Sequence, residues 1–126
     1  MMQVLAVALG GALGSVGRFF VAGWFGRLLG IDFPWGTLAV NVIGGLVMGI
    51  LVEAMALSWS VSPEMRAFLT VGILGGFTTF SAFSLDVVLL AERGQWAEAA
   101  AYVVASVVLS VGALVIGLRA VRLFLA

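Results

Sequence analysis

The sequence predicts an all-α membrane protein with four transmembrane helices. Three observations predict this fold class: the mean hydropathy is +1.26, 63% of the residues are hydrophobic, and only 10% are charged. Soluble domains are far less apolar. Because one span needs about 20 apolar residues, the 126 residues suffice for four spans with short connections. We expect residues 1–126 to form a single four-helix transmembrane domain of a multi-pass protein in the cell (inner) membrane.

The first two helices are expected over residues 3–25 and 35–56, where apolar stretches are bounded by charges. The opening letters MMQVLAVALGGALG are apolar like a signal peptide, but they lack a basic n-region and three further hydrophobic stretches follow. We therefore interpret them as part of a retained first span. In the second helix, the Asn41 amide either bonds a neighbouring helix or donates to an anion.

The third helix is expected over residues 66–90, with Thr78 at its midpoint. The letters GILGGFTTFSAFS, from Gly72 to Ser84, therefore lie at mid-membrane depth. Two glycines followed by two β-branched threonines are poor helix formers, so the stretch predicts either a break or a plain glycine kink. A break at that depth must be buried in protein or line a cavity, and the carbonyls that it frees are available to ions.

The fourth helix is expected over residues 97–124, and three hydroxyl residues follow one another along it at intervals of four: Tyr102, Ser106 and Ser110. This spacing places them in one stripe on a helix. The stripe fits either helix packing or the wall of a pathway. Glycine pairs at small-xxx-small spacing predict close helix packing; they are Gly10 with Gly14, Gly45 with Gly49, and Gly72 with Gly76.

The charged and reactive residues exclude several classes of function. Six basic and six acidic residues give a net charge of zero, and no basic run is present that could bind nucleic acid. The sequence has no cysteine and no histidine, which removes thiolate nucleophiles and the common general base near neutral pH. No pairing of nucleophile and base is visible, so we do not expect an enzyme.

The arginines predict the topology. With four spans, both termini lie on one side, and the arginines then divide three against three: Arg66, Arg119 and Arg122 on the terminal side, and Arg18, Arg27 and Arg93 on the other. Orientation follows the imbalance of basic residues between loops, and here there is none. We therefore expect dual topology and an antiparallel homodimer of a chain with its inverted copy.

Three stretches carry a resemblance to a known family: GGALGSVGRF at Gly10–Phe19, NVIGGLVMG at Asn41–Gly49 and GGFTTFSAF at Gly75–Phe83. With these, the chain resembles the Fluc (CrcB) family of small fluoride channels over essentially its whole length. The resemblance implies a passive, fluoride-selective channel that exports cytoplasmic fluoride through two pores of an antiparallel homodimer. Ala82 departs from the family, which often has threonine there, and Phe19 stands where tyrosine is common.

The resemblance also implies roles for individual residues. Asn41, Phe80 and Phe83 would line the pores, with the phenylalanines presenting their ring edges to fluoride. The family's polar track matches Ser81, Ser84, Tyr102, Ser106 and Ser110.

Two further features follow from the resemblance alone. The backbone carbonyls of Gly75 and Thr78 from both subunits would hold a structural central Na⁺, with no organic cofactor. Arg18 and Asp86 would lie in the vestibules.

Two other functions fit a four-span chain. A small multidrug resistance exporter also forms antiparallel dimers, but it needs an acidic residue in the middle of its first helix, and residues 3–25 contain none. A structural membrane subunit would need only the glycine pairs. It would not require Asn41, the hydroxyl stripe and a broken third helix together.

Overall fold

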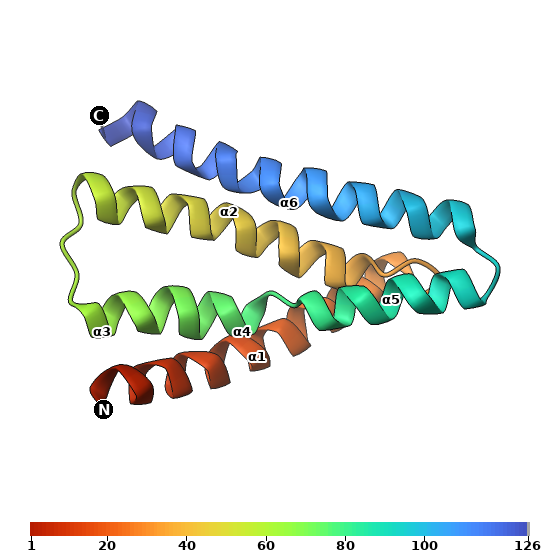
Figure 1. The fold of residues 1–126 in the computed structure, drawn as a ribbon, viewed down its shortest axis with the longest axis horizontal. Coiled ribbons are helices and arrows are strands. Elements are labelled where there is room, and N and C mark those ends of the chain that lie inside the picture. Colours follow the sequence, from red (N-terminus) through yellow and green to blue (C-terminus); the bar gives the residue numbers. More distant parts are fainter. Residues whose placement is uncertain (126) are drawn as a thin grey trace.

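The computed structural model describes residues 1–125, and the secondary structure within them is entirely helical (Figure 1). Within residues 1–125, four helical segments are long and apolar enough to cross a membrane, which confirms the predicted all-α membrane class. The elements are α1 (Met2–Leu29), α2 (Trp35–Leu57), α3 (Pro63–Arg66), η1 (Ala67–Leu74), α4 (Gly75–Phe77), α5 (Phe80–Glu92) and α6 (Trp96–Leu125). The third span, Pro63–Glu92, comprises α3, η1, α4 and α5.

Two helix ends lie three or more residues outside the ranges expected from hydropathy. Helix α1 continues past its expected end to Gly30, which has a φ of +92° and donates its N–H to the Gly26 carbonyl at 2.9 Å. Arg27 lies in the last turn, where a positive charge is favourable, so it does not end the helix. The third span begins at Pro63 because the Ser62 hydroxyl accepts the Met65 N–H at 3.1 Å and caps the first turn.

Both termini and the connection between α2 and α3 lie at one end of the molecule, and the other two connections lie at the opposite end (Figure 1). Helix α2 packs most extensively against α6, while α1 packs against η1 and α4. These pairings place the interrupted third span between α1 and α2. At the terminal end, Arg122 of α6 forms an ion pair with the buried Glu53 of α2 at 3.2 Å.

The glycine pairs lie where helix backbones approach closely. A Cβ atom at Gly10 would lie 2.9 Å from the Cα of Gly72, and one at Gly45 would lie 2.7 Å from the Ser110 carbonyl oxygen. Both distances are shorter than real Cβ contacts allow. The predicted use of glycine for close helix packing is therefore confirmed.

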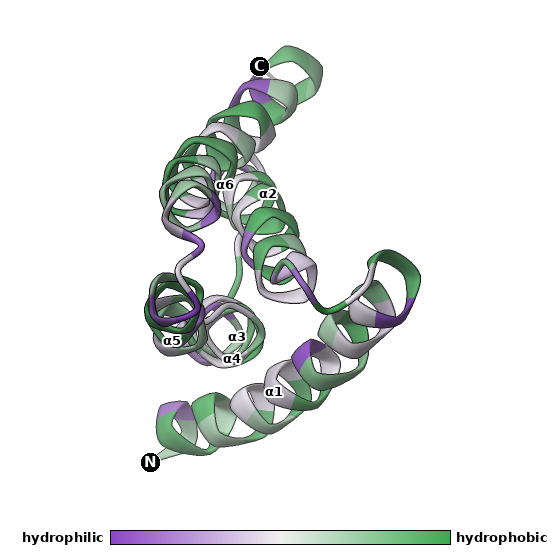
Figure 2. Cartoon of the chain, turned by 90° about the vertical axis from the view of Figure 1, so that its right-hand side faces the viewer, coloured by the Kyte–Doolittle hydropathy of each residue, from purple (hydrophilic) through white to green (hydrophobic). Residues whose placement is uncertain are grey.

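The outer surface is apolar, as a lipid environment requires. Figure 2 shows hydrophobic residues along most of each helix. On α1, large exposed side chains recur every three or four residues and form one lipid-facing stripe: Leu5, Leu9, Leu13, Val16, Phe20 and Trp24.

Candidate functional site

The third span is interrupted at Thr78 and Thr79, whose backbones are extended with φ/ψ of −88°/158° and −152°/122°. The glycine pair before them is helical; Gly75, for example, has φ/ψ of −61°/−38°. The break therefore lies in the threonines and not in the glycines that helped to predict it. Gly76 serves packing instead, because a Cβ there would lie 2.7 Å from the Gly11 carbonyl oxygen of α1.

Asn41 of α2 pairs with the backbone of the break at two points. Its side-chain oxygen accepts the Thr79 N–H at 2.8 Å, and its Nδ2 donates to the Thr79 carbonyl at 3.1 Å. The backbone at the break needs such partners because mid-membrane depth offers little water. Of the two roles that the sequence left open for Asn41, the structure shows the interhelical hydrogen bond.

The hydrogen bonds at the break also divert donors from two carbonyls. In a continuous α-helix the Thr79 N–H would bond to the Gly75 carbonyl, and the Ala82 N–H would bond to the Thr78 carbonyl. Here the Thr79 N–H goes to Asn41, and the Ala82 N–H goes to the Thr79 hydroxyl at 3.1 Å, which caps α5. The Gly75 and Thr78 carbonyls, which lose these two helical donors, are the carbonyls expected to hold a cation.

Arg18 reaches the break from α1. Its Nε donates to the Gly76 carbonyl at 2.9 Å, one residue beyond the first of the carbonyls expected to hold a cation. The side chain is half-buried, and this bond holds it at the depth of the break rather than at the loops. Arg18 thus fixes the end of α4 to α1.

A cavity of about 390 Å³ lies beside the break, between α2, α5 and α6. It brings together five residues that were singled out from the sequence: Asn41, Phe80, Phe83, Ser106 and Ser110. The Phe80 and Phe83 rings are 5.4 Å apart between centroids, with an interplanar angle of 45°. The Phe83 side chain is half-buried, whereas Phe80 is 79% exposed, so Phe80 marks the outer edge of the cavity.

Two hydroxyl groups on the α6 wall of this cavity lack a partner. The Oγ atoms of Ser106 and Ser110 are buried, and neither has a hydrogen bond to any residue that the structure describes. An unpaired buried polar group costs about 1–3 kcal/mol. Two such groups in one otherwise apolar wall indicate a binding site for a polar ligand.

Tyr102 lies on the same face of α6 but does not line this cavity. Its ring is fully buried, 5.2 Å from the Phe83 ring between centroids. Its hydroxyl donates to Oδ2 of Asp86 at 3.0 Å. Tyr102 therefore connects the cavity wall at Phe83 to the carboxylate of Asp86.

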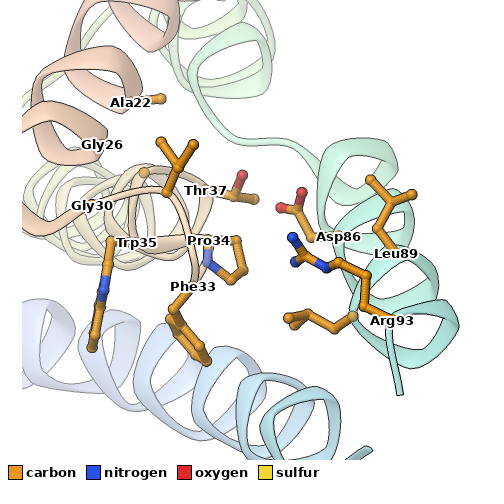
Figure 3. Close-up of a pocket in the computed structure, with 13 residues that line it drawn as sticks. Ala22, Gly26, Gly30, Phe33, Pro34, Trp35, Thr37, Asp86, Leu89 and Arg93 are labelled. Atoms are coloured by element: carbon orange, nitrogen blue, oxygen red, sulfur yellow. The ribbon is translucent and has the colours of Figure 1, made fainter. Parts of the chain in front are cut away.

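A second cavity, of about 300 Å³, lies at the loop end of the molecule, beyond Asp86. Figure 3 shows Thr37 of α2 facing Asp86, and the Arg93 guanidinium directed toward the same space from the end of α5. One positive and one negative side chain thus border this opening. Phe83, Tyr102 and Asp86 form a continuous row of contacts from the first cavity to the second.

Ser81 and Ser84 lie apart from both cavities. The Ser84 hydroxyl donates to the Phe80 carbonyl of its own helix at 2.9 Å. The exposed Ser81 hydroxyl lies 3.3 Å from that of Thr79. Within one subunit, the third span therefore contributes no serine hydroxyl to the row described above.

Three polar residues have a place at these sites that the sequence did not predict for them: Thr37, Thr79 and Arg93. Thr37 precedes Asn41 by four residues, so the two share a face of α2, and this spacing was a usable signal. Arg93 follows Asp86 by two helical turns, and this spacing was a second usable signal. The pairing of Thr79 with Asn41 spans 38 residues, and no local sequence pattern predicts it.

Comparison with known proteins decides the family. The family model described as "CrcB-like protein, Camphor Resistance (CrcB)" matches residues 5–118. The chain belongs to the CrcB family. Similar proteins named "Fluoride-specific ion channel FluC" occur in Nitrobacter winogradskyi, with 58% identity over 119 residues and 94% of each chain covered, and in Rhodospirillum centenum, with 55% identity over 122 residues and 97% of each chain covered.

Membership in the CrcB family confirms the resemblance stated from the three sequence motifs. A third relative with the same name, from Rhizobium etli, is 52% identical over 122 residues, which are 97% of this chain and 98% of the relative. The similarity to these relatives and the four helices long and apolar enough to span a membrane together show that the chain is a multi-pass membrane protein.

Proposed function

We propose that the protein is a passive, fluoride-selective ion channel that exports cytoplasmic fluoride. The observation that carries the proposal is the cavity beside the break, where the unpaired hydroxyls of Ser106 and Ser110 face the same space as Phe80 and Phe83. The name shared by the relatives supports the same ion. A channel performs no covalent chemistry, and the family is one of ion channels rather than enzymes.

The chemistry of the cavity suits fluoride. Fluoride is small and strongly hydrated, so a pore must replace its water with closely spaced donors. Hydroxyl groups and the amide of Asn41 provide such donors, and aromatic rings have a positive edge. None of the residues that line this cavity is charged, and an uncharged lining lets a bound anion leave again.

The second cavity provides an exit toward the loops. An ion leaving the central cavity would pass Phe83 and Tyr102 and reach the opening between Asp86 and Arg93 (Figure 3). The Arg93 charge would attract anions there, while Asp86, engaged by the Tyr102 hydroxyl, would limit how tightly they bind. We assign this opening as one pore mouth.

An antiparallel homodimer would complete the site. Phe80 lines the cavity yet is 79% exposed, so the cavity is open at that edge and a second copy could cover it. Because Arg18 is held at the depth of the break and not at the loops, the remaining arginines divide three against two, and this small imbalance supports an inverted partner. Ser81 and Ser84 lie apart from the cavities of one subunit. In the dimer they would contribute to the partner's pore only by turning their hydroxyls away from Thr79 and the Phe80 carbonyl.

The break fits a structural Na⁺. Gly75 and Thr78 present carbonyls whose helical donors are diverted, and unwound carbonyls are typical Na⁺ ligands in membrane proteins. Two copies would provide four such oxygens. When bound, the cation would supply positive charge that holds the two breaks together.

Reconstituted protein tests the proposal. The purified chain is incorporated into liposomes loaded with potassium fluoride or with potassium chloride. After a potassium ionophore is added, efflux is followed with an electrode selective for the anion in use, fluoride or chloride. We expect rapid fluoride efflux down its gradient, and no comparable efflux from liposomes loaded with potassium chloride. Fluoride efflux no faster than from protein-free liposomes, or chloride efflux at the same rate, would refute the function.

A further inference from the structure

Asn41 touches both the break and the cavity. Its side-chain oxygen and one Nδ2 hydrogen are engaged by Thr79, and an amide nitrogen carries two hydrogens. Asn41 also lines the cavity that contains Ser106 and Ser110. The second Nδ2 hydrogen is therefore available to an anion in that cavity.

The bond from Thr79 to Asn41 acts on both expected cation ligands. The Thr79 N–H and the Thr78 C=O belong to the same peptide group, so a cation on that oxygen polarises the N–H that Asn41 accepts. The same bond draws the Thr79 N–H away from the Gly75 carbonyl, its partner in a continuous helix. One side-chain oxygen thus influences both carbonyls.

Hydrogen bonds in series polarise one another. A cation at the Thr78 oxygen makes the Thr79 N–H a stronger donor to Asn41, and the Asn41 amide in turn becomes a stronger donor from Nδ2. An anion at the Nδ2 hydrogen shifts charge along the same series in the opposite direction, which raises the electron density on the Thr78 oxygen. The two effects reinforce each other.

We propose that Asn41 is the residue that couples the two ions, with its amide linking a cation at the break to an anion in the cavity so that each strengthens binding of the other. The proposal rests on the function proposed above and goes beyond it. Asn41 would be a positioning residue for the cation site as well as a donor in the pore. Coupling of this kind is reciprocal, and the factor by which Na⁺ raises fluoride affinity equals the factor by which fluoride raises Na⁺ affinity.

A binding measurement independent of transport tests this coupling. The full-length protein in detergent is unfolded by heat at increasing Na⁺, with N-methylglucamine keeping the ionic strength constant, once with chloride and once with fluoride as the anion. The rise in unfolding temperature gives the apparent Na⁺ affinity in each anion. For the wild type we expect fluoride to raise that affinity by about fivefold or more, the lower end of usual coupling factors.

Variants separate the two halves of the amide. Asn41→Asp keeps an oxygen that accepts the Thr79 N–H but loses the Nδ2 donor to the Thr79 carbonyl and to the cavity. Because its added negative charge attracts Na⁺, it should keep or strengthen the Na⁺ response and lose the effect of fluoride on it. Asn41→Leu loses both halves and should weaken the Na⁺ response itself. Ser58→Ala is the control, because it removes an exposed hydroxyl at the end of α2 that lines neither cavity and does not touch the break; its Na⁺ affinity and coupling should stay within about twofold of the wild type.

Several outcomes would overturn the coupling. It is wrong if fluoride leaves the wild-type Na⁺ affinity unchanged, if Asn41→Asp retains the full fluoride effect, or if Ser58→Ala abolishes it. Should Asn41→Leu fail to fold, the comparison of Asn41→Asp with Ser58→Ala still decides. Wild-type protein that conducts fluoride in liposomes without showing the coupling would refute this proposal alone, whereas protein that does not conduct fluoride refutes the channel function as well.

Discussion

Replacing Gly45 by alanine tests whether the contact between α2 and α6 sets the width of the cavity. Gly45 lines the cavity, and a Cβ atom there would lie 2.7 Å from the Ser110 carbonyl oxygen, about 0.7 Å short of the 3.4 Å at which ordinary contacts begin. The obstacle is backbone, so no side-chain rotation relieves it. The two helices must separate, and overpacking of this kind costs about 1–3 kcal/mol.

The assay is thermal unfolding of the purified protein in detergent, together with fluoride efflux from liposomes. Gly45→Ala should lower the unfolding temperature by several degrees and change the efflux rate, because Ser110 shifts with its helix. Gly23→Ala is the control, since a Cβ at Gly23 would meet nothing within 4 Å; alanine there should be neutral or stabilise by up to about 1 kcal/mol. Equal unfolding temperatures for the two variants would refute the packing argument.

Four further variants test the remaining parts of the site. Phe80→Ile and Phe83→Ile keep bulk but lose the ring edge, so each should slow fluoride efflux about tenfold or more, or about 1.4 kcal/mol. Size-exclusion chromatography should show the proposed dimer still assembled, and wild-type efflux in both variants would exclude the ring-edge role. Thr79→Val removes the hydroxyl that caps α5 and should cost about 0.5–2 kcal/mol in thermal unfolding; an unchanged unfolding temperature would show that the cap contributes nothing. Arg93→Gln should slow fluoride efflux several-fold near 10 mM salt and much less near 150 mM, because the Debye length falls from about 30 to about 8 Å. Arg27→Gln is the control at the same end of the molecule. Equal effects of the two variants would contradict a specific mouth at Arg93.

The four helices could be predicted because hydropathy and span length are properties of the sequence alone. Their ends could not be predicted as closely, because they depend on caps: Ser62 starts the third span three residues earlier than its charge pattern indicates, and Gly30 lets α1 run past Arg27. A hydropathy pattern marks a helix end where charged residues begin, whereas a cap ends or starts a helix through a single hydrogen bond that the pattern does not reveal.

Some parts of the site could be predicted from the sequence and others could not, because some depend on one helix and others on contacts between helices. The stripe of Ser106 and Ser110 was visible because it follows helical periodicity within one helix, and the structure places both at one cavity. The exact place of the break was not visible, because Thr79 finds its partner in Asn41 on another helix. The proposed mouth at Arg93 depends on how three elements meet (Figure 3), which no single stretch of sequence contains.

Fluoride efflux through a variant without the two unpaired hydroxyls tests most directly whether the cavity beside the break conducts. The double variant Ser106→Ala, Ser110→Ala removes both Oγ atoms that lack partners and leaves the backbone contacts of α6 in place. Ser58→Ala, at the end of α2 away from the cavity, serves as the control. The proposed channel predicts that the double variant folds, assembles and loses most of its fluoride efflux while the control keeps it. Wild-type efflux from the correctly assembled double variant would contradict the assignment of this cavity as the pore.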